Sequence, residues 1–261
     1  MKTKKQNSAF TLIELIVVIS VISLLMALVM PALSLAKKQA KTACCLSNLR
    51  QMAIAADIYT QSEDGYFPIA YAPLQMDPQT SKTVEPCWDF TLEKVWTSPK
   101  PVIRIKPGIL WQHNQVDKIQ QCPAFKGSSN TSDDPYTGYN YNTSYIGFDE
   151  RTNPPRSAKA ALIRSPQNTA LFGDGQVVLN NVIGANKFMR APWANPRDES
   201  FSGRYAGTQG FRHLNKTNVA FADLHAQFLS KCYTDTYDSD KKLIGENTGF
   251  LSPDNSLYDL E

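Results

Sequence analysis

The sequence has little of what most enzyme and metal-binding classes require. Its 261 residues include only three histidines, His113, His213 and His225. No serine lies in a Gly-x-Ser-x-Gly motif, and no glycine-rich phosphate loop follows an apolar run. The five cysteines include no Cys-x-x-Cys pair, which argues against a zinc cage of the common kind. We therefore expect a protein that is not an enzyme.

The chain also lacks an excess of charge. Lysine and arginine number 27 against 24 aspartates and glutamates, a formal net charge of +3. The excess comes from Lys2, Lys4 and Lys5, because the first nine residues contain no acid and the rest of the chain is balanced. A balanced chain offers no electrostatic footprint for a polyanion, so we expect no nucleic-acid partner.

What the sequence does contain is one long apolar run, residues 10–36, which has no charge between Glu14 and Lys37. A helix needs about 20 apolar residues to cross a bilayer, and in lipid an uninterrupted helix satisfies its own backbone hydrogen bonds. The run predicts a transmembrane helix. The alternative is a secretory signal peptide cut after Ala36. Its apolar region usually spans only about 7–15 residues and carries no carboxylate.

Glu14 is the unusual residue of this run. A carboxylate well inside a bilayer costs about 2.5–3.5 kcal/mol on insertion scales, so an acid in such a position is a functional candidate. The alternative is a side chain near the membrane edge that extends towards water.

The N-terminus resembles those of type IV prepilins and type II secretion pseudopilins. A lysine-rich leader, residues 1–9, precedes the sequence Phe-Thr-Leu-Ile-Glu, which begins at Phe10. The resemblance implies that a prepilin peptidase cuts between Ala9 and Phe10 and that the new amine is methylated. It also implies that Glu14 serves assembly and that Pro31 kinks the helix. Ala9 departs from the family, which usually has glycine before the cut.

The resemblance also implies a location and partners. Lysines flank both ends of the apolar run, so their distribution does not settle its orientation. Prepilins keep the leader in the cytoplasm, which makes this a single-pass protein of the bacterial inner membrane with an exported head. Its subunits then enter a periplasmic or extracellular filament. The implied partners are the peptidase, other pilin or pseudopilin subunits, an inner-membrane assembly platform and membrane lipid.

The physical chemistry of cleavage agrees with this resemblance. A cut before Phe10 creates a cationic amine at the end of a lipid-buried helix. The carboxylate of Glu14 on a neighbouring subunit is a natural counter-charge, because opposite charges attract more strongly at low dielectric.

Residues 37–64 continue the helical pattern as an amphipathic half. Leu46, Leu49, Ala53 and Ala56 recur at helical spacing, Ile54, Ile58 and Tyr59 widen the apolar face, and Gly65 and Pro68 mark the end. Residues 65–261 then form the exported head. We predict an α+β fold in which the long helix packs on a mainly antiparallel β head.

Within the head, residues 102–105 and 109–111 are predicted strands, and the tyrosine-rich segment 139–145 is a predicted loop with aromatic anchors. Such a loop can bind sugars, although packing is the simpler interpretation. Residues 169–179 and 218–229 are predicted hairpins, with turns at Asp174-Gly175 and Asp223-Leu224.

Nine residues separate His213 from Asp223, a spacing that resembles the His–nine residues–Asp-Gly signature of bacterial prepilin-like proteins with long heads. Leu224 stands where that signature has glycine, which puts a tight left-handed turn in doubt. His213, Asp223 and His225 are a candidate metal set, and a hydrogen bond from His213 within the hairpin is the simpler interpretation.

Two further hypotheses concern the head. Some pseudopilins hold calcium in a C-terminal loop, which makes Asp235, Asp238 and Asp240 candidate ligands for a structural Ca²⁺; a solvated loop is the alternative. We expect no other cofactor. Cys87 and Cys122 each lie beside a proline in the exported head, where disulfides persist, and are a candidate disulfide pair.

Together these observations predict a structural subunit of a type IV pilus-like or type II secretion pseudopilus filament. The alternative is an exported binding protein, tethered to the membrane or secreted, whose prepilin-like segment serves only for export and whose ligand is a carbohydrate.

Overall fold

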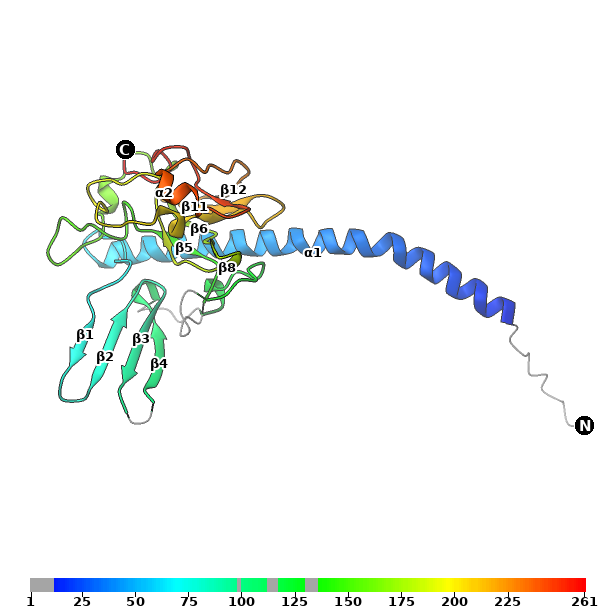
Figure 1. Ribbon diagram of the computed structural model, residues 1–261, viewed down its shortest axis with the longest axis horizontal. Helices are drawn as coiled ribbons and strands as arrows, with labels where there is room; N and C mark the ends of the chain where they lie inside the picture. Colours follow the sequence, from blue (N-terminus) through cyan, green and yellow to red (C-terminus); the bar gives the residue numbers. More distant parts are fainter. Residues whose placement is uncertain (1–11, 98–99, 112–116, 130–135) are drawn as a thin grey trace, which may run out of the picture. The chain divides into compact units, whose positions relative to one another are not determined.

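The computed structural model describes residues 12–97, 100–111, 117–129 and 136–261. The chain divides between Ala40 and Lys41 into two compact units, and one long helix, α1 (Leu12–Ser62), contains that boundary (Figure 1). Antiparallel β-sheets follow the helix. The predicted α+β, pilin-like arrangement is therefore confirmed. The predicted cleavage site, Ala9 and Phe10, lies outside the described residues.

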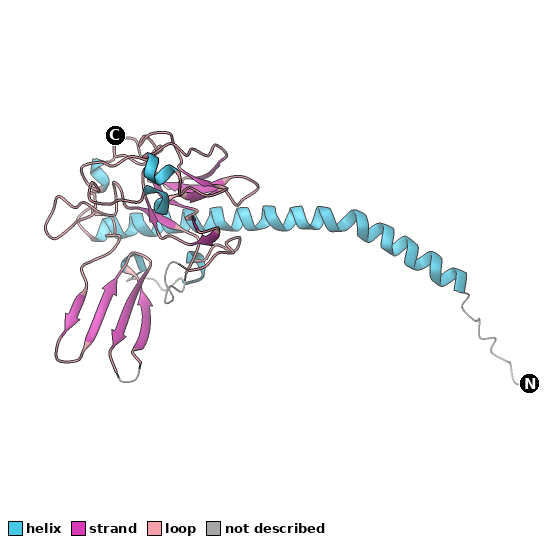
Figure 2. Cartoon of the chain, viewed as in Figure 1, coloured by secondary structure: helices cyan, strands magenta, loops and turns pink. Residues whose placement is uncertain are grey.

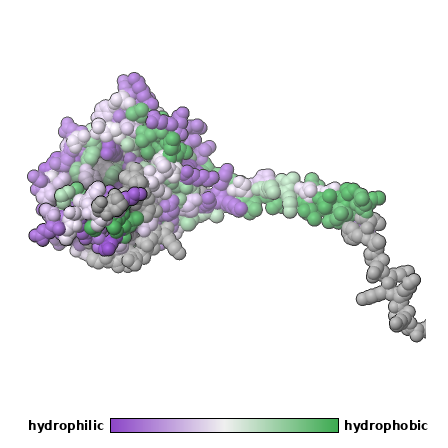
Figure 3. Space-filling model, turned by 60° about the horizontal axis from the view of Figure 1, so that its bottom comes forward, coloured by the Kyte–Doolittle hydropathy of each residue, from purple (hydrophilic) through white to green (hydrophobic). Residues whose placement is uncertain are grey.

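The first part of α1 exposes apolar side chains around its whole circumference. Leu12 is 73% exposed, Leu28 69% and Ile22 44%. Figure 3 shows hydrophobic residues along this part of the helix, and Pro31 lies within it. In the described chain, α1 is the one helix long and apolar enough to cross a membrane. A helix that is apolar on every side is stable only in lipid or within a bundle of other apolar helices.

The second part of α1 buries one narrow stripe in the head. The stripe recurs every three or four residues and comprises Cys45, Asn48, Leu49, Met52, Ala53, Ala56 and Thr60. It confirms the predicted positions Leu49, Ala53 and Ala56. Ile54 and Ile58 are 40% and 50% exposed, so the prediction that they widen the buried face is wrong. Small and polar residues dominate the stripe because the head's aromatic side chains occupy the space beside it.

The helix ends close to Gly65, as the sequence predicts. Asp64 and Gly65 adopt left-handed φ angles of 50° and 79°, and the Gly65 N–H donates to the Thr60 carbonyl over 2.9 Å. This reversal satisfies a free carbonyl at the helix C-terminus.

The strands of the head are drawn in magenta in Figure 2. Five of them form a sheet of order β12-β11-β6-β5-β9. Its pairs are antiparallel except for β5 with β9, which is parallel. The strands are β5 (Asn140–Asn142), β6 (Ala170–Gly173), β9 (Phe188–Met189), β11 (Thr217–Phe221) and β12 (Ala226–Leu229).

Both faces of the strands β11, β6 and β5 are buried, whereas the edge strand β12 is partly exposed. In β11, Ala220 packs in the core cluster that contains the α1 stripe, together with Trp88, Tyr141 and Phe172. Val219 and Phe221, on either side of Ala220, lie on the opposite face of the strand. They pack in a second cluster that includes Phe250, Leu251 and Tyr258. The sheet therefore lies between the helix and the C-terminal segment.

A second, antiparallel sheet has the order β1-β2-β3-β4, with strands β1 (Gln75–Asp77), β2 (Lys82–Pro86), β3 (Phe90–Val95) and β4 (Val102–Pro107). β4 confirms the strand predicted at 102–105. The strand predicted at 109–111 is wrong, because this segment is the 3₁₀-helix η1 (Ile109–Trp111). Its three consecutive side chains are all buried, which an alternating strand with one exposed face does not allow.

Only one of the two predicted hairpins forms. β11 and β12 are confirmed as a hairpin, and Leu224 adopts a left-handed φ of 72° at its turn. The hairpin predicted at 169–179 is wrong: β6 pairs with β5 and β11, while β7 (Val177–Leu179) pairs with β8 (Val182–Gly184). The turn of that ribbon is Asn180-Asn181, and both residues have positive φ.

The segment 139–145 is not the predicted loop, because it contains strand β5. Its aromatic side chains are anchors: Tyr139 and Tyr141 are buried, and the Tyr141 ring stacks on Phe172 with centroids 4.9 Å apart. These two rings therefore present no surface for a sugar.

The remaining short elements close the head. A ribbon pairs β10 (Gln209–Gly210) with β13 (Thr248–Gly249). Single turns of helix are η2 (Asp117–Gln120), η3 (Ala160–Leu162), η4 (Arg204–Gly207) and α2 (Asp238–Lys241).

Candidate functional site

Two places in the chain carry residues whose chemistry is not explained by packing alone. The first is the start of α1, where Glu14 lies in the first turn and is followed by the exposed apolar residues up to Leu35. Pro31 lies inside the helix, and the kink that the resemblance implies there stays a prediction. Glu14 is therefore the acidic group at the beginning of an apolar helix segment whose side chains are exposed.

The second place is a buried cluster built from four distant segments. Cys45 comes from the stripe of α1, Cys122 follows η2, Asp174 follows β6, and His213 precedes β11. All four side chains are buried, and their ligand-type atoms lie within 4.8 Å of one another. We call these four residues the Cys–Asp–His cluster.

The internal distances of the cluster are short. Cys45 Sγ lies 3.0 Å from Cys122 Sγ, and Cys122 Sγ lies 3.8 Å from His213 Nε2. His213 Nε2 lies 3.2 Å from Asp174 Oδ2. The two thiols, the imidazole and the carboxylate thus form one continuous chain of contacts.

Neighbouring groups hold each member in place. Thr42 Oγ1 lies 3.2 Å from His213 Nδ1. Arg212 Nη2 donates to Asp174 Oδ1 over 3.0 Å, and the Asn218 N–H donates to Asp174 Oδ2 over 2.7 Å. These contacts orient the imidazole and the carboxylate towards the sulfur atoms.

The surroundings of the cluster shift the pKa values of its two thiols in opposite directions. Burial by itself raises the pKa of Cys122, but the hydrogen bond from Cys45 and the Arg212 guanidinium outweigh it and hold that pKa well below its usual range. The Cys122 sulfur and burial in turn raise the pKa of Cys45. Burial lowers the pKa of His213, yet Asp174 and Cys122 raise it overall to about 9. A thiolate at Cys122 is a strong ligand or nucleophile.

The structure corrects the predicted role of His213. It does not meet Asp223: that carboxylate contacts His225 at the surface, whereas His213 is only 2% exposed and contacts Asp174 and Cys122. The side chain of His213 also does not bind the β11–β12 hairpin; only its backbone pairs, with Lys216. His113 lies outside the described residues.

The predicted Cys87–Cys122 disulfide is wrong in this structure. Both residues are free thiols, and the sulfur that contacts Cys122 is that of Cys45. The proline neighbours indicated loops but not which thiols the fold brings together. Cys87 is half-buried, and burial raises its pKa.

The predicted calcium ligands do not converge. Asp235 Oδ1 accepts from Lys241 Nζ over 2.8 Å, and Asp240 accepts from the backbone N–H of Arg204. In the ranges that the structure describes, the Cys–Asp–His cluster is the one group of metal-ligand side chains, and it includes none of Asp235, Asp238 and Asp240.

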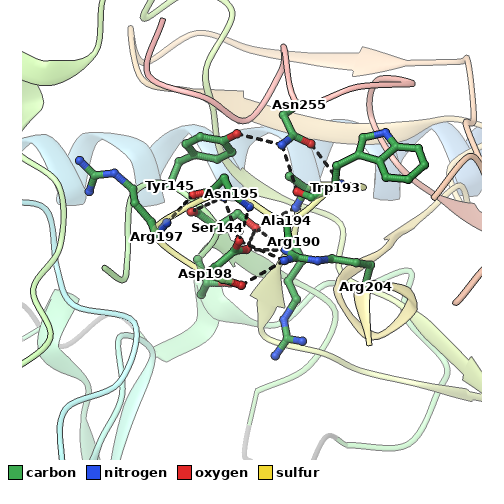
Figure 4. A network of polar contacts seen from close by, with 12 residues as sticks. Ser144, Tyr145, Arg190, Trp193, Ala194, Asn195, Arg197, Asp198, Arg204 and Asn255 are labelled. Atoms are coloured by element: carbon green, nitrogen blue, oxygen red, sulfur yellow. Dashed lines mark hydrogen bonds and ion pairs between the residues drawn. The ribbon is translucent and has the colours of Figure 1, made fainter. Parts of the chain in front are cut away.

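A further polar network, shown in Figure 4, is structural. Arg204 and Asp198 form an ion pair in which both side chains are 1% exposed, and Arg204 Nη2 donates to Asp198 Oδ1 over 3.0 Å. Asn195 Nδ2 donates to the same carboxylate over 2.9 Å, and Ser144 donates to it as well. The network joins the loop before η4 to the end of β5, and its polar groups satisfy one another.

An aromatic pocket lies near this loop. Its volume is about 200 Å³, and its lining consists of Tyr71, Thr143, Phe188, Arg190 and Phe201. The ring of Tyr71 lies edge-on to Phe201, with centroids 6.4 Å apart, and the guanidinium of Arg190 lies over Phe201. The pocket combines ring faces with one cation.

Sequence reasoning missed Cys45, Asp174 and Arg212 as members of a site. Cys45 occupies a core position of the helical stripe, and Asp174-Gly175 has the composition of a turn. No local pattern in the sequence indicates which of these side chains meet.

Comparison with known proteins adds one finding. Residues 4–30 match the model of the prokaryotic N-terminal methylation motif. No curated protein and no solved structure matches the chain. The match covers residues 4–9 of the leader and most of the apolar run, including Phe10 and Glu14. It is consistent with the predicted resemblance, and it indicates that this chain is a prepilin-like protein whose N-terminus is processed for export or assembly.

Proposed function

We propose that this protein is a structural subunit of a type IV pilus-like or type II secretion pseudopilus filament. The observation that supports this proposal is the methylation motif at residues 4–30, which overlaps a helix segment with exposed apolar side chains. Such a segment must be covered by lipid before assembly and by other apolar helices afterwards.

The proposed assembly step uses the residues at the start of α1. A prepilin peptidase removes the leader before Phe10, and the resulting amine enters the apolar bundle. The carboxylate of Glu14 on a neighbouring subunit neutralises that amine. The ion pair fixes the axial register of adjacent subunits, because charges at any other register remain buried without a counter-charge.

The remaining partners and locations follow from this proposal. The unassembled subunit resides in the bacterial inner membrane with its leader cytoplasmic and its head exported, and an assembly platform extracts it from lipid. The filament is periplasmic or extracellular. The head serves contacts between subunits and has no catalytic role.

The test is the mass of the mature N-terminus together with the state of assembly. We expect the protein purified from membranes to begin with methylated Phe10, and to be recovered with sheared filaments or as crosslinked oligomers. A mature chain that begins at Lys37 and stays monomeric would contradict the proposal.

The aromatic pocket favours a second candidate function, an exported binding protein that keeps the prepilin segment only as a tether. Rings such as Tyr71 and Phe201 stack on the apolar faces of sugars, and Arg190 supplies hydrogen-bond donors. Glycan-array binding that is lost in Phe201→Ala, by a protein that forms no filament, would favour this function over assembly.

A further inference from the structure

The Cys–Asp–His cluster has no role in the proposed filament function, which depends on the N-terminal half of α1. It also exceeds what packing needs. Cys45 and Cys122 fit a core as small apolar groups, but Asp174 and His213 are ionisable side chains with at most 2% exposure. Charged groups are rarely buried so deeply unless they are paired or bind a metal ion, and the pairing with Arg212 involves only Oδ1 of Asp174.

We propose that Cys45, Cys122, Asp174 and His213 bind a structural zinc ion. Two thiolates, one imidazole nitrogen and one carboxylate oxygen make the four-ligand set that tetrahedral zinc takes in structural sites. Calcium and magnesium require mostly oxygen ligands, and iron–sulfur clusters are usually held by four cysteines, so the donor set favours zinc.

The distances fit this coordination. Zinc–ligand bonds of about 2.0–2.3 Å at tetrahedral angles separate neighbouring ligand atoms by about 3.3–3.8 Å. The Cys122 Sγ to His213 Nε2 distance is 3.8 Å, and the His213 Nε2 to Asp174 Oδ2 distance is 3.2 Å. The two sulfur atoms, 3.0 Å apart, have to separate by less than 1 Å, which a small rotation of one cysteine side chain within its rotamer well provides.

The surrounding groups are those that a zinc site needs. Metal-bound histidine normally has a hydrogen-bond partner on its other nitrogen, and here Nδ1 of His213 lies beside Thr42 Oγ1. Asp174 accepts from Arg212 through Oδ1, and its Oδ2, which also accepts from the Asn218 N–H, lies 3.2 Å from the imidazole. With zinc, the positive charges of the ion and Arg212 balance the two thiolates and the carboxylate, so the buried site is neutral.

The competing arrangement is a disulfide between Cys45 and Cys122. Their sulfur atoms are 3.0 Å apart, whereas a disulfide bond measures about 2.05 Å. A disulfide also needs neither Asp174 nor His213, and it leaves the convergence of these two side chains on the thiols unexplained. Bound zinc keeps both sulfur atoms reduced in an oxidising compartment, because the lone pairs that would react are held by the metal.

A zinc ion here joins α1 to three segments of the head. Cys45 lies on the helix, and the other ligands come from the segments around η2, β6 and β11. The site therefore holds the helix stripe against the central sheet, in addition to the packing of the stripe's own side chains.

The test uses the full processed chain, purified in detergent without chelators. We expect elemental analysis to find about one zinc per chain. Cys122→Ala should lose at least nine-tenths of it, whereas Cys87→Ala, which removes a half-buried thiol outside the cluster, should keep it. Equal zinc in both variants would overturn the proposal, as would a wild-type chain that binds none after reduction and incubation with zinc chloride.

A second measurement does not depend on the folding of a variant. Wild-type chain loaded with Co²⁺ should show tetrahedral ligand-field bands and a thiolate-to-cobalt charge-transfer band, which Zn²⁺ then abolishes. Cobalt binding without the charge-transfer band would overturn the assignment of the cysteines. Peptide mapping that finds Cys45 and Cys122 joined by a disulfide in freshly isolated protein would overturn it in favour of that bond.

Discussion

The two parts of α1 contrast in a way that reverses the usual relation between hydrophobicity and burial. Before Ala40 the helix is built of leucine, isoleucine and valine, and these side chains are exposed in the single chain. After Lys41 its buried stripe includes two alanines, Asn48 and Thr60. The apolar side chains of the first part therefore need lipid or other chains to cover them. The small side chains of the second part instead let the helix approach the aromatic rings of the head closely.

The largest effect should come from Glu14→Leu. Membrane insertion and leader cleavage should persist, because the change removes a charge from lipid and leaves Phe10 intact. Filament assembly should fall to background, since the amine of each neighbour then enters the bundle without a counter-charge, at a cost of several kcal/mol. The measurement compares processed subunit in membranes with subunit in the sheared fraction.

Glu63→Leu is the matched control, because this exposed acid follows the other end of the same helix. It should assemble normally. Normal assembly of Glu14→Leu itself would remove the ion pair from the mechanism and leave Glu14 as a tolerated residue at the membrane edge.

The same substitution in both parts of the helix tests the contrast directly. Leu49 is fully buried, so Leu49→Ala should destabilise the head by about 2–5 kcal/mol. Leu33 is 50% exposed, and Leu33→Ala should change head stability by no more than about 0.5 kcal/mol. Thermal unfolding in detergent, followed by tryptophan fluorescence, measures both. Equal losses would mean that the head also packs on the first part of the helix.

Acid should act on the head through Asp149. Burial raises the pKa of this carboxyl, but hydrogen bonds from Arg151 and the charge of Arg197 outweigh burial and lower it. A folded-state pKa below the unfolded value of about 3.9 adds stability above that pH, and the stability is lost as the pH falls through the folded pKa. Asp149→Asn should therefore reduce the difference in melting temperature between about pH 5 and about pH 3.

Arg151→Gln should act in the same direction, because it removes the group that donates to Asp149. A pH dependence identical in wild type and in both variants would show that other carboxyls govern the acid response.

The smallest effect should be a gain in stability from Leu224→Gly. Leu224 has a left-handed φ of 72° in the β11–β12 turn, a conformation that costs leucine about 1–2 kcal/mol and glycine almost nothing. Glycine loses more entropy on folding and some side-chain packing, so the net gain should be about 0.5 kcal/mol. Leu162→Gly, at an exposed position of η3, should instead lower the melting temperature. A lower melting temperature for Leu224→Gly would mean that packing of Leu224 outweighs the strain.

Local patterns predicted much of this fold because their causes are local. The apolar run, the end of α1 at Gly65, strand β4 and the β11–β12 hairpin each depend on residues close together in the chain. The failures have a common origin. Asp174-Gly175 has the composition of a hairpin turn, yet β6 has better partners in β5 and β11, and the sequence between strands does not encode that preference.

The sequence by itself therefore determined the processing segment, the carboxylate at Glu14 and the long helix with its change from an apolar to a mixed surface near residue 40. Each of these follows from the chemistry of a short stretch of chain. Only the tertiary structure decided that Cys45, Cys122, Asp174 and His213 meet. Their convergence depends on the register of β6 and β11 and on which face of α1 is buried. Those are properties of packing between segments up to 168 residues apart, from Cys45 to His213, and no local pattern contains them.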